Sequence, residues 1–197
     1  MGLSQIYERC ENMTDNDILR LKKNLRIVED FPKAGVQFID ITTLLEDGEL
    51  FKLVVDWMQE VAAGLDFTKI VAIESRGFIF GAALASVTGK GLVLARKPKK
   101  LPADTISVSY GLEYGSDSLE MHRSAIAKGE RVILVDDLLA TGGSLLAAAD
   151  LVEQLGGVVA GALLPLELSN FEGIGRVKSR GISLHTLMGF PFFNVIE

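Results

Sequence analysis

The chain contains very little cysteine and histidine, and it lacks a long apolar run. Cys10 is the one cysteine among 197 residues, which excludes an intrachain disulfide and a zinc site built on several cysteines. This composition suits a reducing compartment, and we expect a cytoplasmic protein. The polar segment 1–20 lacks the apolar core of a signal peptide. Because no apolar run approaches the ~20 residues that span a bilayer, we expect no membrane partner.

Basic residues are also fewer than acidic residues. The chain has 20 Lys and Arg against 26 Asp and Glu, for a net charge of -6. A domain that binds nucleic acid normally carries a basic face, so we expect no nucleic-acid partner. One basic cluster departs from this trend, with four cations in five positions: Arg96, Lys97, Lys99 and Lys100. Such a cluster on an acidic chain indicates either a local anionic ligand or a solvated surface loop.

The remaining composition, 48% hydrophobic and 23% charged, is that of an ordinary globular domain. Apolar periodicity predicts helices up to about Asn24 and over 47–64, 77–87 and 142–155. Short apolar runs predict strands over 69–73, 91–95, 131–135, 158–164 and 182–187. Alternation with serine over 105–123 predicts an antiparallel hairpin or a mobile loop. Strands that alternate with helices predict a parallel sheet covered on both faces, with its ligand at the carboxyl ends of the strands.

The richest of these ends follows the strand predicted over 131–135. Asp136 and Asp137 come directly after it, and a helix then begins after a run of small residues: Ala140, Thr141, Gly142, Gly143 and Ser144. A helix start offers free N–H groups and a positive dipole end, which suit a phosphate. The carboxylates can accept hydrogen bonds from sugar hydroxyls or hold Mg²⁺ through water. The pattern predicts a ribose 5-phosphate site; an ordinary turn with an acidic pair is the alternative.

The string Val-Asp-Asp-Leu-Leu-Ala-Thr-Gly-Gly over 135–143 resembles the signature of type I phosphoribosyltransferases, which binds phosphoribosyl pyrophosphate (PRPP). The resemblance implies that residues 140–144 bind the 5-phosphate. It implies that Asp136 and Asp137 bind the ribose hydroxyls, with Mg²⁺ nearby through PRPP and water and no direct protein ligand.

The same resemblance implies an α/β fold, with a central, mostly parallel sheet flanked by helices and a flexible catalytic hairpin. It implies one domain over 1–197, in which 1–45 form an N-terminal helix and a small base-binding hood and 46–190 form the core. A homodimer is also implied.

The string Glu-Ser-Arg-Gly-Phe over 74–78 follows another predicted strand and resembles the pyrophosphate loop of adenine phosphoribosyltransferases. The resemblance implies that Arg76 and the Ser75 backbone face the pyrophosphate. It also implies a non-proline cis peptide between Glu74 and Ser75. Without the resemblance, an ion pair between Arg76 and Glu74 at a helix start explains these residues equally well.

The basic cluster matches the family motif Arg-Lys-x-x-Lys-Leu-Pro, which implies a role toward pyrophosphate for Arg96, Lys97 and Lys100. Lys99 has no counterpart in the motif, and we expect it to be solvated.

The string Leu-Glu-Tyr-Gly over 112–115 resembles the flexible catalytic loop of adenine phosphoribosyltransferases. The resemblance implies that Glu113 handles the proton on the adenine imidazole. Tyr114 would help to cover PRPP, and Arg76 would complete the catalytic set. The alternative is an exposed hairpin in which Glu113 serves solubility. His122 and His185 match no motif, and we expect both to be structural.

Residues 30–42 resemble the family's N-terminal motif, which implies that Phe38 stacks on adenine and that the backbone near Val36 reads its exocyclic amine. Two positions depart from the motif: Ala34 replaces a common proline and Ile39 replaces the usual arginine. Phe38 is alternatively a core residue.

The family implies the transfer of phosphoribose from PRPP to adenine for purine salvage, giving AMP and pyrophosphate. The transfer would pass through an oxocarbenium-like sugar beneath a closing loop. The alternatives are the same chemistry on another purine, such as xanthine, and a regulator that binds PRPP without catalysis.

Overall fold

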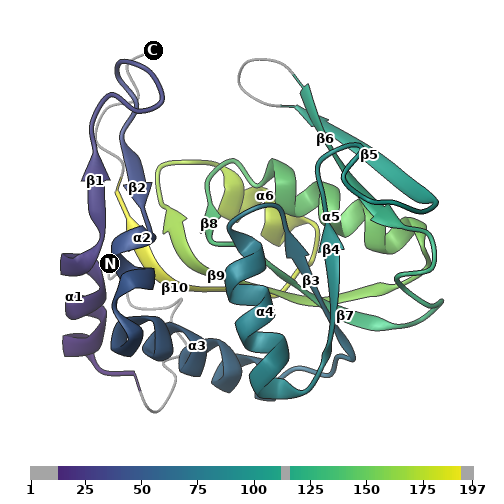
Figure 1. Cartoon of the computed structure of the whole chain (residues 1–197), viewed down its shortest axis with the longest axis horizontal. Helices are drawn as coiled ribbons and strands as arrows, with labels where there is room; N and C mark the ends of the chain where they lie inside the picture. The colour runs from purple at the N-terminus through teal and green to yellow at the C-terminus, as the bar shows by residue number, and fades with distance from the viewer. Residues whose placement is uncertain (1–12, 112–115, 192–197) are drawn as a thin grey trace.

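The computed structural model describes residues 13–111 and 116–191, which form a parallel sheet with helices on both faces (Figure 1). The strand order is β10-β9-β7-β3-β4, and β8 pairs with β9 near the end of β7. Every pairing within this sheet is parallel. The bounds are β3 Lys69–Ile73, β4 Gly91–Ala95, β7 Arg131–Val135, β8 Leu138–Leu139, β9 Val158–Leu168 and β10 Leu184–Phe190. The α/β prediction is confirmed.

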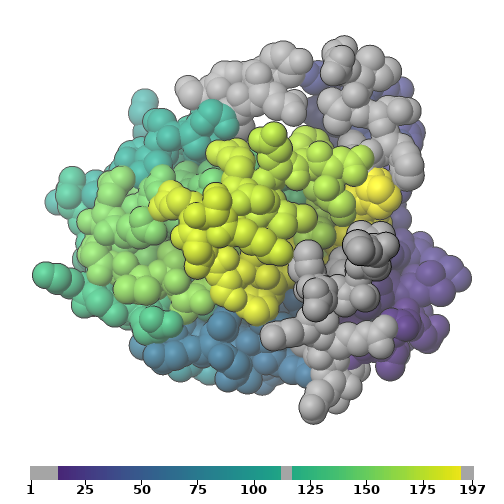
Figure 2. Space-filling model, turned by 180° about the vertical axis from the view of Figure 1, so that it is seen from behind, coloured from purple at the N-terminus to yellow at the C-terminus, as the bar shows by residue number. Residues whose placement is uncertain are grey.

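The central strands are apolar on both sides because helices cover both faces of the sheet. Along β3, Ile70 packs into one core cluster and Val71 into the other, and both are fully buried. The first cluster includes side chains of α3 (Gly48–Ala63) and α4 (Gly77–Thr88), and the second includes those of α5 (Gly143–Gln154) and α6 (Gly173–Ser179). Figure 2 shows the reverse side, where the C-terminal third of the chain, in yellow and yellow-green, fills the centre of the surface.

The N-terminal part forms a small extension of the core. Helix α1 (Asp15–Asn24) begins with a capping box between Thr14 and Asp17. Strands β1 (Arg26–Val28) and β2 (Phe38–Asp40) form an antiparallel ribbon, and α2 (Thr42–Glu46) leads back to the core. The ribbon stands beyond one edge of the sheet, close to β10 (Figure 1). We refer to α1, β1, β2 and the loop 29–37 between the two strands as the hood.

Residues 105–111 and 116–122 pair as the two antiparallel strands of a hairpin, which is one of the two alternatives that the sequence left open. Its strands are β5 (Thr105–Gly111) and β6 (Ser116–His122), paired over their whole length. The hairpin lies on α5, on the face opposite α4. Leu119 and Met121 of β6 are fully buried, so one side of the hairpin belongs to the core.

Several details differ from the sequence predictions. The last strand runs over Leu184–Phe190 instead of 182–187, and Ile182 is buried in the core without belonging to the strand. The two hood strands, α2, β8 and α6 were not predicted. On α1, Leu21 is fully buried as expected, but Leu19 is 49% exposed and lies outside the apolar side. Within the described residues, no helix is long and apolar enough to cross a membrane.

Candidate active site

The turns after β3 and β7 lie next to each other because the two strands are hydrogen-bonded neighbours. Arg76, in the first turn, places its Nε 2.9 Å from Oδ2 of Asp137 in the second. The peptide between Glu74 and Ser75 is cis, as the resemblance implied. The pairing of Arg76 with Glu74 is wrong, since Glu74 binds Arg96 instead. The structure therefore brings the expected pyrophosphate and ribose segments together.

Gly77 allows this close approach at the start of α4. A Cβ on Gly77 would lie 2.7 Å from the carbonyl oxygen of Val135 and 3.0 Å from Cα of Asp136. Both distances are shorter than a real Cβ contact, so a larger residue would push α4 away from the end of β7.

Asp136 and Asp137 are buried at the end of β7, with 8% and 4% exposure. Burial and the neighbouring Asp137 charge raise the pKa of Asp136 well above its ordinary value. Burial also raises the pKa of Asp137, although Arg76 opposes this effect. Oδ2 of Asp137 accepts no aligned hydrogen bond from the described part of the chain. A buried carboxylate oxygen in that state suits a hydroxyl donor from a ligand.

The segment 140–144 forms a turn at the start of α5. Gly142 caps the helix in the left-handed conformation (φ +76°), and no side chain caps the helix start. The Gly143 N–H has only a long contact of 3.5 Å with Oγ1 of Thr141. The first N–H groups of a helix have no partner within the helix, so the start of α5 offers donors of the kind that bind phosphate.

The basic cluster borders the turn after β3. Nε and Nη2 of Arg96 donate to the carboxylate of Glu74 at 3.1 and 3.2 Å. Burial would raise the pKa of Glu74, but hydrogen bonds from Arg96 and the Lys97 N–H outweigh it and lower the pKa. Lys100 is exposed beside them. Lys99 is exposed as expected, and its N–H donates to Glu120.

Lys97 connects this cluster to the hairpin. Its Nζ binds the carboxylate of Asp117 and donates to the Tyr110 hydroxyl at 2.7 Å. The Tyr110 ring lies against Gly143, where a Cβ would come within 3.0 Å of it. Glu113 and Tyr114, the expected catalytic loop residues, lie outside the described residues, so their roles stay predictions.

The hood contributes an aromatic wall. The Phe38 ring meets Phe31 edge to face, with centroids 5.1 Å apart. The guanidinium carbon of Arg76 lies 5.1 Å from the centre of the same Phe38 ring. Val36 uses its N–H and its carbonyl within the turn 31–36, and the carbonyl keeps one free lone pair. The two residues expected at the base therefore lie on the hood, and Phe38 faces the pyrophosphate turn.

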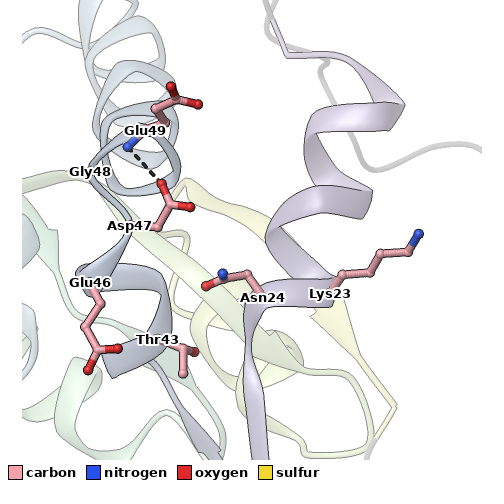
Figure 3. A pocket seen from close by; sticks show the side chains of 7 residues that line it. All are labelled: Lys23, Asn24, Thr43, Glu46, Asp47, Gly48 and Glu49. Carbon is pink, nitrogen blue, oxygen red and sulfur yellow. Dashed lines mark hydrogen bonds between the residues drawn. The ribbon is translucent and has the colours of Figure 1, made fainter.

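A separate open pocket lies at the foot of the hood (Figure 3). It lies between the end of α1 and the corner joining α2 to α3, where Asp47 accepts from the Glu49 N–H at 3.0 Å. Its lining is mostly polar: Lys23, Asn24, Thr43, Glu46, Asp47, Gly48 and Glu49. None of the residues expected from the sequence to bind substrate lines this pocket.

Comparison with known proteins agrees with this geometry. Residues 40–166 match the model of the phosphoribosyl transferase domain. An adenine phosphoribosyltransferase of Chlorobaculum tepidum is 51% identical over 172 residues, covering 86% of this chain and 97% of the relative. The chain belongs to the adenine phosphoribosyltransferase family.

Solved structures support the same assignment. The adenine phosphoribosyltransferase of Thermoanaerobacter pseudethanolicus superposes with a TM-score of 0.84 at 46% identity, covering 88% of this chain and 99% of that one. The Saccharomyces cerevisiae enzyme, complexed with adenine and D-2,5-dideoxy-2,5-imino-altritol 1,6-bisphosphate, gives a TM-score of 0.81 at 35% identity, with coverages of 89% and 100%.

Ile39, which departs from the family motif, is a core residue. Ile39 is 6% exposed and packs into the cluster that contains Leu21 and Leu25 of the α1 segment. Phe38 and Asp40 point to the other side of β2, as alternation along a strand requires. The missing arginine charge therefore does not alter the face that Phe38 presents.

Some residues that complete the site were not predicted from the sequence. Phe31, Tyr110 and Asp117 join it through contacts between segments that are separate in sequence. The one available signal was the alternation that placed Tyr110 on a strand. The expected structural histidines stay outside the site: His122 ends β6, and His185 contacts Ser183 at 2.9 Å.

Proposed function

We propose that this protein transfers the phosphoribosyl group of PRPP to adenine, releasing pyrophosphate and giving AMP. The observation that carries the proposal is the start of α5 beside the buried carboxylate of Asp137, whose Oδ2 forms an ion pair with Nε of Arg76 at 2.9 Å. N–H donors for a phosphate, a carboxylate that can accept from a hydroxyl, and a fixed cation thus share one edge of the sheet. The relatives of the same family that carry this activity in their names support the choice of substrates.

In the proposed reaction, the turn 140–144 holds the 5-phosphate, and Asp136 and Asp137 hold the ribose hydroxyls. The bond between C1 and the pyrophosphate oxygen breaks early, leaving positive charge on the sugar. Arg76, with Arg96 and Lys97 behind it, would face the leaving pyrophosphate together with Lys100 and the Ser75 backbone. Opposite charges fixed before the reaction stabilise such a leaving group without reorganisation.

Adenine would lie against Phe38 on the hood, with the backbone of Val36 at its exocyclic amine. An imidazole nitrogen of adenine bonds to C1 of the ribose, and its proton passes to Glu113. Tyr114 and the rest of the segment 112–115 would cover the site. Exclusion of water prevents hydrolysis of the reactive sugar. Adenine bound to the yeast enzyme of the same family supports a base site in this fold.

Mg²⁺ belongs to the same proposal. Among the described residues, no group of three His, Cys, Asp or Glu side chains is arranged to hold a metal. The two carboxylates after β7 fit an ion carried mainly by PRPP oxygens and water, because hard oxygen donors suit Mg²⁺. Mg²⁺ held near Asp136 and Asp137 would supply positive charge that offsets the charge of the pyrophosphate.

A homodimer and a cytoplasmic location complete the proposal. The apolar side chains of Ile79 and Val87 on α4 are 39% and 47% exposed, and Leu92 on the edge strand β4 is 39% exposed. A contact between two copies through this face would cover them. The single cysteine, Cys10, suits the reducing cytoplasm.

The test is to supply the purified protein with PRPP and Mg²⁺ and to offer adenine, hypoxanthine, guanine and xanthine separately. AMP from adenine alone supports the proposal, and Glu113→Gln should then lower kcat by about 10²-fold or more. Glu49→Gln is the matched control, because the Glu49 side chain is 85% exposed at the start of α3 and Glu49 is not expected to bind substrate, so kcat should stay unchanged. Turnover of another purine would refute the choice of base, and PRPP binding without turnover would favour a regulator.

A further inference from the structure

Helix α6 packs directly against the outer side of the turn 140–144. Gly173 comes so close that a Cβ on it would lie 2.0 Å from the carbonyl oxygen of Ala140. Nη1 of Arg176 donates a hydrogen bond of 2.7 Å to the carbonyl oxygen of Thr141. Val177 is fully buried, and its Cγ2 lies 3.4 Å from the place of a Cβ on Gly142. Helix α6 thus donates a hydrogen bond to one carbonyl of the turn and packs closely against the carbonyl before it.

The carbonyls matter because a peptide group is planar. In a trans peptide the C=O and the following N–H point in opposite directions, so holding one sets the direction of the other. The Thr141 carbonyl shares its peptide with the Gly142 N–H, and the Ala140 carbonyl shares its peptide with the Thr141 N–H. Contacts on the outer side of the turn therefore orient N–H groups on the inner side.

The turn needs such support because of its own sequence. Gly142 and Gly143 are adjacent, and glycine loses more conformational freedom on ordering than any other residue. A glycine peptide that is free to rotate would have to be ordered when phosphate binds, which weakens binding. A guanidinium on the carbonyl also polarises the peptide, which makes its N–H a stronger donor.

We propose that Arg176 is a positioning residue for PRPP: by holding the Thr141 carbonyl, it orients the turn that binds the 5-phosphate. This inference rests on the proposed function, in which residues 140–144 bind that phosphate. Arg176 acts through the backbone of Thr141 and Gly142 and not through contact with the substrate.

The test compares three variants of the full-length protein. Arg176→Met removes the hydrogen bond and keeps much of the side-chain length, and Arg176→Lys restores a charged donor. Arg180→Met is the matched control, because Arg180 follows the same helix but pairs with Asp150 and Glu153 on α5, at 2.9 Å each. The measurements are the KM values for PRPP and adenine, the Kd for ribose 5-phosphate by calorimetry at two salt concentrations, and the Tm.

Arg176→Met should raise the KM for PRPP and the Kd for ribose 5-phosphate by roughly 10- to 100-fold, the effect of one hydrogen bond to a charged group. The KM for adenine at saturating PRPP should change less than about twofold, and Arg176→Lys should recover part of the loss. Arg180→Met should leave the KM for PRPP and the Kd for ribose 5-phosphate unchanged. The salt dependence of ribose 5-phosphate binding should be the same in Arg176→Met as in the wild type.

Three results would overturn the inference. If Arg176→Met and Arg180→Met lost the same affinity for ribose 5-phosphate, the cause would be a general effect of charge or of helix stability. A weaker salt dependence in Arg176→Met would mean direct contact with the phosphate. An unchanged Kd in Arg176→Met would mean that the turn needs no support. The wild type separates this inference from the proposed function: no AMP from wild-type protein refutes the function, whereas ribose 5-phosphate binding still tests Arg176.

Discussion

Arg76 and Asp137 form an ion pair across two adjacent strands, with Nε of Arg76 2.9 Å from Oδ2 of Asp137. The pair links the turn expected at pyrophosphate to the turn expected at ribose. The Asp137 side chain is only 5% exposed, while Arg76 retains 35% exposure and can be solvated without its partner. Loss of the carboxylate should therefore affect binding more than folding.

Asp137→Asn should weaken PRPP binding by about 10- to 100-fold, because it removes a charged acceptor for a ribose hydroxyl. The Tm should stay level or rise, since the substitution also removes a buried charge. Calorimetry with PRPP and a thermal melt measure the two effects. A large drop in Tm with unchanged PRPP affinity would show that Asp137 is structural.

Asp136→Asn should make stability depend less on pH. Burial and the Asp137 charge raise the pKa of Asp136 in the folded protein, so the folded state holds this proton more strongly than the unfolded state. Wild-type stability therefore falls as pH rises from about 4 through the raised pKa. The variant should match the wild type below pH 4 and melt more than about 2 °C higher at pH 7. Thermal melts of the variant and the wild type between pH 4 and pH 7 measure this difference. A variant less stable than the wild type at pH 7 would contradict the prediction.

Asp40→Asn should show the opposite pH dependence. A hydrogen bond from the Thr42 N–H, followed by those from Arg26, lowers the pKa of Asp40 to about 2. Its contribution is present above the ordinary value of 3.8 and is lost as pH falls toward 2. Since Arg26 is 56% exposed, solvent screening limits the loss in the variant to about 1 kcal/mol at neutral pH. Denaturant unfolding at pH 7 and pH 3 should show the difference shrinking at the lower pH.

Gly77→Ala should destabilise the protein by about 1–3 kcal/mol, because its Cβ would lie 2.7 Å from the Val135 carbonyl oxygen. It should also raise the KM for PRPP, since Asp136 must move. Gly48→Ala is the matched control: Gly48 begins a helix, and a Cβ there meets nothing within 4 Å. The control should melt at or above the wild-type Tm, and equal losses in both variants would refute the steric argument.

Asp117→Asn should tighten PRPP binding by about 2- to 5-fold, the strength of a partly exposed ion pair. Asp117 binds Lys97, a residue expected at the pyrophosphate, and so competes with the substrate. Burial would lower the pKa of Lys97, but the bonds to Asp117 and Tyr110 raise it, so Lys97 stays charged at neutral pH. Asp56→Asn serves as the control, because Asp56 also pairs with a lysine, Lys52, but on α3 outside the proposed site. Weaker PRPP binding in Asp117→Asn would mean that the ion pair holds Lys97 in its working position.

The elements that the sequence predicted well are the ones with one strong local signal. β3, β4 and β7 are short apolar runs that glycines or polar residues end, and their predicted bounds agree with the structure. The hood strands have three residues each and expose Ile27, so no alternation was visible. α6 was missed because Gly173 and Gly175 lower its helix propensity, although tertiary contacts stabilise it.

The site was predictable in its position and less so in its pairings. The residues after β3 and β7 were expected together because parallel strands end at one edge. The predicted partner of Glu74 was wrong because its actual partner, Arg96, lies 22 residues away along the chain, and no local pattern encodes that contact. The Arg176 contact joins positions 35 residues apart, and no periodicity encodes such a distance.

Because β3 and β7 are adjacent strands, the sheet sets the distance between the turns that follow them. Neighbouring strands lie about 4.8 Å apart because backbone hydrogen bonds set that spacing, and no side-chain substitution changes it. The fold itself therefore sets the separation between the turn after β3, expected at pyrophosphate, and the turn after β7, expected at ribose. The hood is built on a ribbon outside that sheet, so a substitution in the hood leaves the separation of the two turns unchanged. Substitutions in the hood can thus change the proposed choice of base while the turns proposed to bind the sugar phosphate keep their separation.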